Sequence, residues 1–318
     1  MRAAALKMVH KLAQRDERVL YIGSDPGAGT LDAMASEFPD RRMIEGISEA
    51  HIIGMAAGLA MEGYIPYVNT IATFLTRRCY EQVAVDLCLH RLPVRLIANG
   101  GGLVYAPLGP THQAIEDIAI MRALPNMTVL CPADADEMRR MMEQTIDLPG
   151  PAYIRVAKGG DPIVSREENG FCLGRGIIMR DPGEALLVTT GIMLQRALAA
   201  AEILEAGGVD VGILHLHTVK PLDVDTLLFA AGHARLVVTI EEHVCNGGLG
   251  SAVLEALHDN LESNIPRVVR LALPDEFMHS YGSQENLLQQ HGLTAERIAS
   301  SVGLALSNKA ARFATVRA

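Results

Sequence analysis

The sequence contains no tryptophan, and aromatic residues make up only 4% of its 318 positions. So few aromatic side chains leave little surface on which nucleic-acid bases could stack. The formal net charge is −9, whereas nucleic acids and anionic membranes are bound by basic faces. No apolar run is long enough to cross a bilayer. The composition therefore argues against nucleic acid or a membrane as the main partner.

Cysteine is scarce, and no CxxC motif occurs. Without paired spacing we expect neither a zinc site nor a disulfide framework, and the thiols should be reduced and structural. Residues 1–23 have the pattern of an amphipathic helix leading into a strand, without the apolar core and cleavage site of a signal peptide. We therefore expect a cytoplasmic protein. The cysteines are Cys79, Cys88, Cys131, Cys172 and Cys245.

Several common catalytic motifs are also missing. GxxxxGK[ST], HExxH and GxSxG do not occur, which argues against phosphate-loop enzymes, zinc proteases and the commonest hydrolases. The stretch GAGTLD follows an expected strand but lacks the third glycine of a dinucleotide fingerprint.

Short β-branched runs alternate with helical patterns over most of the chain, which predicts mostly parallel sheets covered by helices. The alternation stops at KGGDPIVSREENGFCLGRG, a polar, glycine-rich stretch that indicates a linker with a short hairpin. The length fits about two domains. We therefore expect two doubly wound α/β domains, residues 1–157 and 184–318, joined by a linker over 158–183. Expected helices of the first domain include 74–90, 111–124 and 134–146.

Polar residues cluster at the ends of the expected strands, where open parallel sheets bind ligands. Glu49 is the most informative of them, because it stands at the start of the apolar stretch AHIIGMAAGLA. An acidic residue there can complement the helix dipole after Ser48, or it can be a catalytic group. The convergence of polar groups favours a catalytic group. These groups are Asp25, Glu49, Asn69, Asn99 and His112.

Three blocks resemble the C-terminal two-thirds of transketolase and 1-deoxyxylulose-5-phosphate synthase: GISEAHIIGMAAGLAMEGYIPYV, TFLTRRCYEQ and GPTHQAIEDIAIMRALPNMTVLCPAD. A fourth, EEHVCNGGLGSAVLEAL, is similar to the C-terminal domain of that family. The resemblance covers nearly the whole chain. It implies a pyrimidine-binding domain followed by a transketolase C-terminal domain, and thiamine diphosphate as the cofactor.

The resemblance implies specific roles. Glu49 would bond the N1′ nitrogen of the aminopyrimidine and so promote loss of the thiazolium C2 proton. Phe74 would stack on the aminopyrimidine, and Tyr80 would line the same pocket. His112, in GPTHQ, matches a histidine near the reacting carbonyl and would be a second catalytic residue. Asp25, at a strand end, is a further candidate for cofactor binding.

Besides His112, four residues are candidates for substrate binding. Arg77 matches an arginine of the deoxyxylulose-phosphate synthase pattern, and Arg155 and Lys158 stand where the family grips a sugar phosphate. Leu108 replaces an aspartate that contacts a substrate hydroxyl in transketolases. The loop also begins with NGGG instead of a family histidine. The details of sugar recognition should therefore differ from those of transketolase.

The GDG motif that holds the diphosphate and Mg²⁺ is absent from the chain. We therefore expect no metal ligands here, and a partner chain that carries them in an α2β2 assembly. The main hypothesis is the small subunit of a split transketolase-like enzyme that transfers a two-carbon ketol to an aldehyde. Three alternatives remain. Two of them are thiamine-diphosphate enzymes: the β subunit of a 2-oxo acid dehydrogenase E1, and a decarboxylating carboligase like deoxyxylulose-phosphate synthase. The third is a non-catalytic scaffold.

Overall fold

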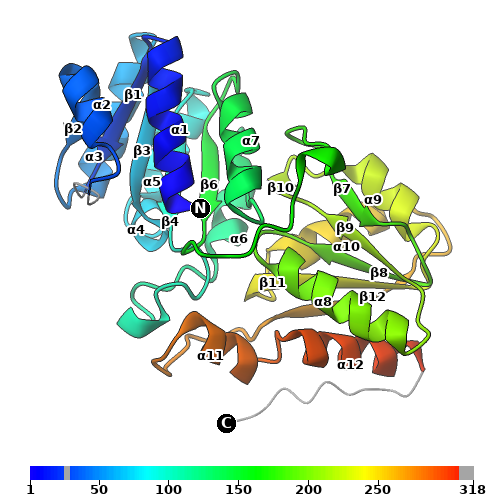
Figure 1. The fold of residues 1–318 in the computed structure, drawn as a ribbon. Coiled ribbons are helices and arrows are strands. Elements are labelled where there is room, and N and C mark those ends of the chain that lie inside the picture. The colour runs from blue at the N-terminus through cyan, green and yellow to red at the C-terminus, as the bar shows by residue number, and fades with distance from the viewer. Residues whose placement is uncertain (25–28, 308–318) are drawn as a thin grey trace.

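Two sheets, each covered by helices, form the two lobes of the protein (Figure 1). The computed structural model describes residues 1–24 and 29–307. The first sheet has the strand order β10-β5-β6-β4-β3-β1-β2, and the second has the order β12-β11-β8-β9-β7. All pairings are parallel except those of β10 with β5 and β7 with β9. The expected α/β class, with two mostly parallel sheets, is confirmed.

The first sheet is built from strands whose side chains are buried on both faces, which is why their sequences are continuous apolar runs. One core lies under α1 and α7, and the other lies under α3 and the segment that follows β3. The strands are β1 (Val19–Gly23), β2 (Arg42–Ile44), β3 (Ile65–Ile71), β4 (Arg95–Asn99), β5 (Thr128–Leu130), β6 (Ala152–Val156) and β10 (Thr218–Lys220).

Two of the expected helices of the first lobe differ from prediction. The stretch 74–90 is divided into α4 (Ala72–Thr76), α5 (Tyr80–Gln82) and a π-helix (Val83–Leu89), and helix α6 is limited to Asp117–Ala123. The prediction was wrong at 111–116 because the GPTHQ segment is a loop. The remaining helices are α1 (Arg2–Arg15), α2 (Asp32–Glu37), α3 (Glu49–Met61), α7 (Ala135–Thr145) and the 3₁₀ turns Pro39–Arg41 and Ala106–Leu108.

The second lobe follows the same plan. The linker expected over 158–183 contains a 3₁₀ turn (Glu167–Asn169) and strand β7, which joins the second sheet instead of forming a separate hairpin. No helix in the described parts of the chain is long and apolar enough to span a bilayer. The strands are β7 (Ile177–Arg180), β8 (Ala185–Thr189), β9 (Val211–His215), β11 (Leu236–Val244) and β12 (Arg267–Leu273). The helices are α8 (Met193–Ala206), α9 (Val224–Ala231), α10 (Leu249–Asn260), α11 (Gln284–Gln290) and α12 (Ala295–Leu306).

A buried group of polar side chains joins the two lobes. Glu137 of α7 accepts a hydrogen bond from the backbone N–H of Ala133 at 2.6 Å and lies 3.0 Å from Nε2 of His215, at the end of β9. Ser165 donates to the same carboxylate at 3.2 Å. Burial alone would raise the pKa of Glu137, but His215, with help from His217 and the Ala133 N–H, outweighs it and lowers that pKa to about 2.

His217 stacks on Phe171 beside this group, with ring centroids 4.4 Å apart. Its Nε2 is buried with no hydrogen-bond partner among the described residues. Burial lowers the pKa of His217 to about 4; Glu137 opposes the shift, and His215 and Arg140 add to it. The junction is therefore built around a neutral histidine.

We expect acid to weaken this junction. The pKa of His217 is lower in the folded chain, about 4 against the ordinary 6.5, so the unfolded chain binds more protons between these values. The contribution of His217 is complete above pH 6.5 and is lost as the pH falls through 4, for a total of about 3 kcal/mol. Thermal unfolding of His217→Phe should depend less on pH in this window. The exposed His90→Phe variant should show the same pH dependence of unfolding as the wild type. An equal change of unfolding temperature with pH in all three proteins would contradict the role given to His217.

Candidate active site

Glu49 is the first residue of α3, and its carboxylate is not used to cap that helix. Ser48 precedes it, but the Ser48 hydroxyl donates to the carbonyl of Glu45 at 3.0 Å. The Glu49 side chain is only 1% exposed. Its Oε2 accepts from Nη1 of Arg78 at 2.8 Å, and its Oε1 lies 3.5 Å from the hydroxyl of Thr70 at the end of β3. A buried carboxylate so placed faces the carboxyl edge of the sheet.

Three further side chains complete what we call the Glu49 cluster: Phe74, Arg78 and His112. The guanidinium carbon of Arg78 lies 4.1 Å from the centre of the Phe74 ring. The His112 ring meets the same phenyl ring edge-on, with centroids 5.3 Å apart. The structure thus brings together the three residues expected at the reaction centre, Glu49, Phe74 and His112. It adds Arg78, which the sequence analysis missed.

Arg77 holds the GPTHQ loop in place. Its guanidinium forms a two-point ion pair with Glu116 and donates to the carbonyls of Pro110 at 3.3 Å and Gln113 at 3.0 Å. Thr73 also donates to the carbonyl of His112 at 3.0 Å. These bonds fix the backbone that carries His112. Arg77 is therefore placed as a brace for the loop, which differs from the substrate-binding role expected from the sequence.

Tyr80 is directed away from the Glu49 cluster. Its hydroxyl donates to the carbonyl of Ile120 in α6 at 2.9 Å, and burial raises the pKa of Tyr80. This arrangement ties α5 to α6 and does not fit the pocket-lining role expected for Tyr80. Asp25, the other expected cofactor ligand, lies outside the described residues.

Arg155 does not reach the site as a free cation. It forms a two-point ion pair with Asp117, at 2.8 and 3.0 Å, and donates to the carbonyls of Ala114 at 3.1 Å and Glu242 at 2.9 Å. Burial alone would lower the pKa of Arg155, but Asp117, together with Cys131 and Glu242, outweighs it and raises that pKa. The donors of Arg155 thus bridge the two lobes, and its substrate-binding role stays a prediction.

Lys158 and Leu108 remain exposed. Lys158 follows β6 at the carboxyl edge of the sheet. Leu108, 51% exposed, ends the 3₁₀ turn before GPTHQ. The ring of Tyr281 lies against the next residue, Gly109, so tightly that a Cβ there would collide with it. Leu108 therefore stands at the surface beside the loop that carries His112.

Backbone conformation and close packing explain the glycines of the NGGG segment. Gly100 and Gly102 have φ angles of 80° and 67°, a region that favours glycine. A Cβ at Gly100 would collide with Tyr105, and one at Gly102 would collide with Glu242 of the second lobe. Glu242 also accepts from the N–H of Leu103 at 2.9 Å. No side chain fits at Gly100 or Gly102, so this loop serves close packing between the lobes.

Two buried polar side chains next to the site lack partners within the described parts of the chain. The amide group of Gln113, the last residue of GPTHQ, has no partner at either its oxygen or its nitrogen, and neither has Oδ1 of Asn99, at the end of β4. Unpaired buried amides cost free energy. The carboxyl edge of the first sheet therefore offers polar groups that its own residues do not use.

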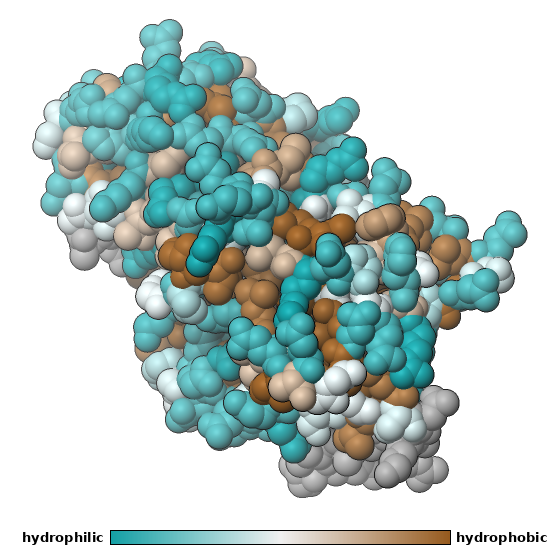
Figure 2. Space-filling model, turned by 45° about the vertical axis from the view of Figure 1, so that its right-hand side comes forward, coloured by the Kyte–Doolittle hydropathy of each residue, from teal (hydrophilic) through white to brown (hydrophobic). Residues whose placement is uncertain are grey.

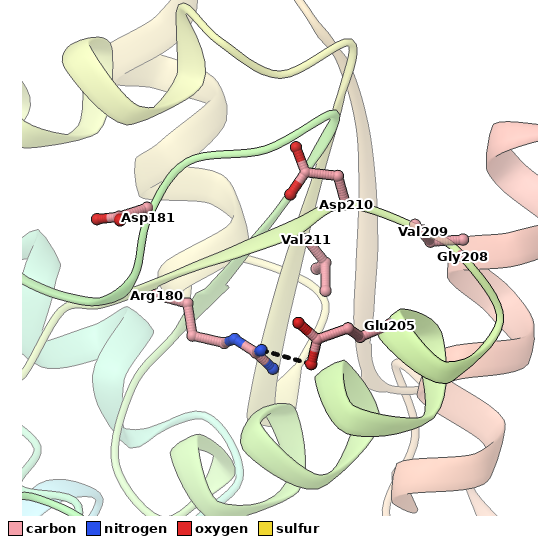
Figure 3. A pocket seen from close by; sticks show the side chains of 7 residues that line it. All are labelled: Arg180, Asp181, Glu205, Gly208, Val209, Asp210 and Val211. Atoms are coloured by element: carbon pink, nitrogen blue, oxygen red, sulfur yellow. Dashed lines mark hydrogen bonds and ion pairs between the residues drawn. The ribbon is translucent and has the colours of Figure 1, made fainter.

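No three His, Cys, Asp or Glu side chains come together as metal ligands in the described residues. A cavity of about 510 Å³ lies instead on the second lobe, between the end of β7 and the start of β9 (Figure 3). Its lining carries the carboxylates of Asp181, Glu205 and Asp210, with Arg180 paired to Glu205 at 2.7 Å. This excess of negative charge is unfavourable for an anionic ligand.

The fold and the site define an α/β protein whose buried carboxylate and aromatic ring meet at the carboxyl edge of a parallel sheet. Residues 1–160 match the family model of the transketolase pyrimidine binding domain, and residues 174–298 match that of the transketolase C-terminal domain. The chain therefore belongs to the transketolase family.

Individual relatives agree with this assignment. The chain is 37% identical over 299 residues to 1-deoxy-D-xylulose-5-phosphate synthase of Caldanaerobacter subterraneus subsp. tengcongensis, covering 93% of this chain and 47% of that protein. It is 34% identical to a 6-deoxy-6-sulfo-D-fructose transketolase subunit of Clostridium sp. (strain MSTE9), covering 94% of this chain and 92% of that subunit. A solved structure described as a split gene transketolase, inactive beta4 tetramer, has a TM-score of 0.86 at 36% identity and covers 96% and 97% of the two chains. The chain spans about half the length of the synthases that it matches.

Proposed function

We propose that this chain is the pyrimidine-binding subunit of a two-chain, thiamine-diphosphate-dependent transketolase that transfers a two-carbon ketol to an aldehyde. The observation that carries the proposal is the position of Arg78. Its flat cationic group lies over the Phe74 ring at 4.1 Å and bonds Glu49 at 2.8 Å. The same ring and carboxylate can therefore accept a flat, protonatable aminopyrimidine, so the residues present fit that end of the cofactor.

When bound, thiamine diphosphate supplies the electron sink that lets a bond next to a carbonyl break. Glu49 would supply proton control, because a positioned carboxylate can exchange a proton with the group that it contacts. Phe74 orients the ring of the ligand by stacking. His112, whose loop is held by Thr73 and Arg77, would exchange a proton with the substrate oxygen.

A second chain is needed to complete the cofactor site. Mg²⁺ requires several oxygen ligands, and the described residues contain no acidic cluster that could provide them. Two large side chains near the segments of the Glu49 cluster are exposed: Ile47, two residues before Glu49, is 83% exposed, and Tyr281, whose ring lies against Gly109 of the GPTHQ loop, is 69% exposed. Exposed side chains of this size fit burial under a partner. Figure 2 shows apolar patches within a mostly hydrophilic face. We propose an α2β2 enzyme in the cytoplasm, with the Mg²⁺ ligands on the partner.

The split-transketolase relative supports the need for a second subunit, since that structure is described as an inactive beta4 tetramer. A decarboxylating synthase is a second candidate, because the chain is 37% identical to 1-deoxy-D-xylulose-5-phosphate synthase over 93% of its length. The two reactions differ in one product. A synthase releases carbon dioxide from its donor, whereas a transketolase releases an aldehyde.

The chain alone is expected to bind thiamine diphosphate weakly, without help from Mg²⁺, and to show no turnover. The reason is that the metal and diphosphate ligands lie on another chain. Calorimetry with and without Mg²⁺ measures the binding. Turnover should appear when the partner subunit is added, with an aldehyde product from a ketose donor and no carbon dioxide from pyruvate. Tight, Mg²⁺-dependent binding to the lone chain would contradict the proposal.

We further propose that the acceptor aldehyde carries no hydroxyl at the position that faces Leu108. A leucine side chain cannot return the hydrogen bonds that a desolvated hydroxyl loses. Exposed Lys158 leaves room for an anionic end on the substrate. The complete enzyme should therefore prefer anionic deoxy aldehydes in an acceptor series. If ordinary sugar phosphates react about a hundredfold faster than every deoxy analogue, a difference of about 2.7 kcal/mol, Leu108 has no such role.

A further inference from the structure

Arg78 makes both of the contacts that the proposed function reserves for the cofactor. Its Nη1 donates to Oε2 of Glu49 at 2.8 Å, and its guanidinium covers the Phe74 ring at 4.1 Å from the centroid. Arg78 comes from the turn between α4 and α5, only four residues after Phe74. The ring and the carboxylate are thus bridged by one flat cation of the chain itself.

The two ends of this ion pair differ in burial, which makes the pair asymmetric. The Glu49 side chain is 1% exposed, whereas the Arg78 side chain is 45% exposed. An ionised carboxylate buried to this degree is costly without a counter-ion. The Arg78 side chain, by contrast, is already nearly half exposed and loses little on moving outward. Breaking the ion pair therefore costs Glu49 more free energy than it costs Arg78.

We propose that Arg78 is an internal placeholder for the aminopyrimidine: it pairs with Glu49 and covers Phe74 until the cofactor displaces it into solvent. The inference rests on the proposed function. Only one flat group can lie on that face of Phe74 while bonding the Glu49 carboxylate. Arg78 and the cofactor therefore compete, and the apparent affinity for the cofactor is reduced by the fraction of chains in which Arg78 is in place.

The neighbouring Arg77 does not share this role, although it has the same chemistry. Arg77 is bound to Glu116 and to two backbone carbonyls of the GPTHQ loop. Arg78 has one carboxylate partner among the described residues, and that partner is Glu49. The adjacent arginines thus have different roles: Arg77 holds the GPTHQ loop, and Arg78 occupies the space between Glu49 and Phe74.

The test uses the full-length chain with Arg78→Met, which substitutes for the aliphatic stem of the side chain but removes the charge and the flat group. A placeholder predicts two changes of opposite sign. The ligand-free chain should unfold at a lower temperature, because Glu49 loses its counter-ion. Thiamine diphosphate should bind about tenfold more tightly, measured by calorimetry. Arg78→Lys, which can pair with Glu49 but cannot stack as a plane, should fall between the wild type and Arg78→Met in both measurements.

The matched control is Arg235→Gln, which removes an arginine from an exposed ion pair of the same length, 2.8 Å to Glu184. It should change neither measurement. Weaker or unchanged cofactor binding in Arg78→Met overturns the placeholder and leaves the proposed function standing, because the wild-type chain still binds. If Arg78→Met does not fold, the Arg78→Lys affinity decides alone: no tightening overturns the inference. Absence of binding to wild type and variants, with or without the partner subunit, would overturn the proposed function itself.

Discussion

Glu49→Gln is expected to lower kcat of the complete two-subunit enzyme by about 100- to 10,000-fold, the range for loss of a positioned acid–base group. Glutamine keeps the size and can still hydrogen-bond, but it cannot take and return a proton. The fold should survive because the new amide group would still lie beside Arg78 and Thr70. Steady-state kinetics at saturating substrate and cofactor measure the effect, so a change in cofactor affinity does not contribute to it.

Glu62→Gln is the matched control, since Glu62 is exposed at the opposite end of α3. Its kcat should equal that of the wild type. Exchange of the cofactor C2 proton, followed by NMR in the Glu49→Gln complex, reports the chemical role separately from turnover. An unchanged exchange rate together with an unchanged kcat would show that Glu49 is only a structural residue at the helix start.

Asp117→Asn is expected to destabilise the chain by about 3–5 kcal/mol, the cost of leaving a buried charge without its partner. Asp117 is fully buried, accepts from Arg155 at two points, and also accepts from the hydroxyl of Tyr153 at 2.7 Å. Asparagine preserves the shape but leaves the Arg155 cation uncompensated. The unfolding temperature should fall by at least about 6 °C.

Glu184→Gln provides the comparison, because Glu184 pairs with Arg235 at the surface. Exposed pairs contribute about 0–1 kcal/mol, so this variant should unfold within about 3 °C of the wild type. Similar small changes in both variants would mean that the buried Asp117–Arg155 pair contributes no more to stability than an exposed pair. Calorimetric scans at one pH and one salt concentration make the two directly comparable.

Much of this molecule follows from patterns that depend on short stretches of sequence. The mostly parallel sheets were predicted because short β-branched runs alternate with helical patterns, and strands such as β1 and β4 are indeed runs buried on both faces. Glu49 was singled out because a charge stood where apolar residues begin, and the structure places it in a buried cluster with Phe74 and His112. Each of these features is set by neighbours in the chain.

The sequence is less informative where partners come from distant parts of the chain. Arg155 was expected to bind substrate because of the family resemblance, and its local sequence did not reveal that Asp117 and the carbonyl of Glu242 contact it. Arg78 stands directly after Arg77, and nothing local tells the two apart. The helix expected over 111–124 was too long because Arg77 and Thr73 hold the GPTHQ backbone as a loop. Tertiary contacts override the local pattern in each case.

Strand β10 has a consequence for how such a chain could be divided. It lies after β9 of the second lobe, yet it pairs antiparallel with β5 and covers one edge of the first sheet. A gene split between the two family segments would leave β5 with a bare edge, and exposed edges recruit strands from other molecules. It would also leave Glu137 without His215. The resulting halves would be prone to aggregate, so the boundary between the two family segments is a poor place to cut this protein.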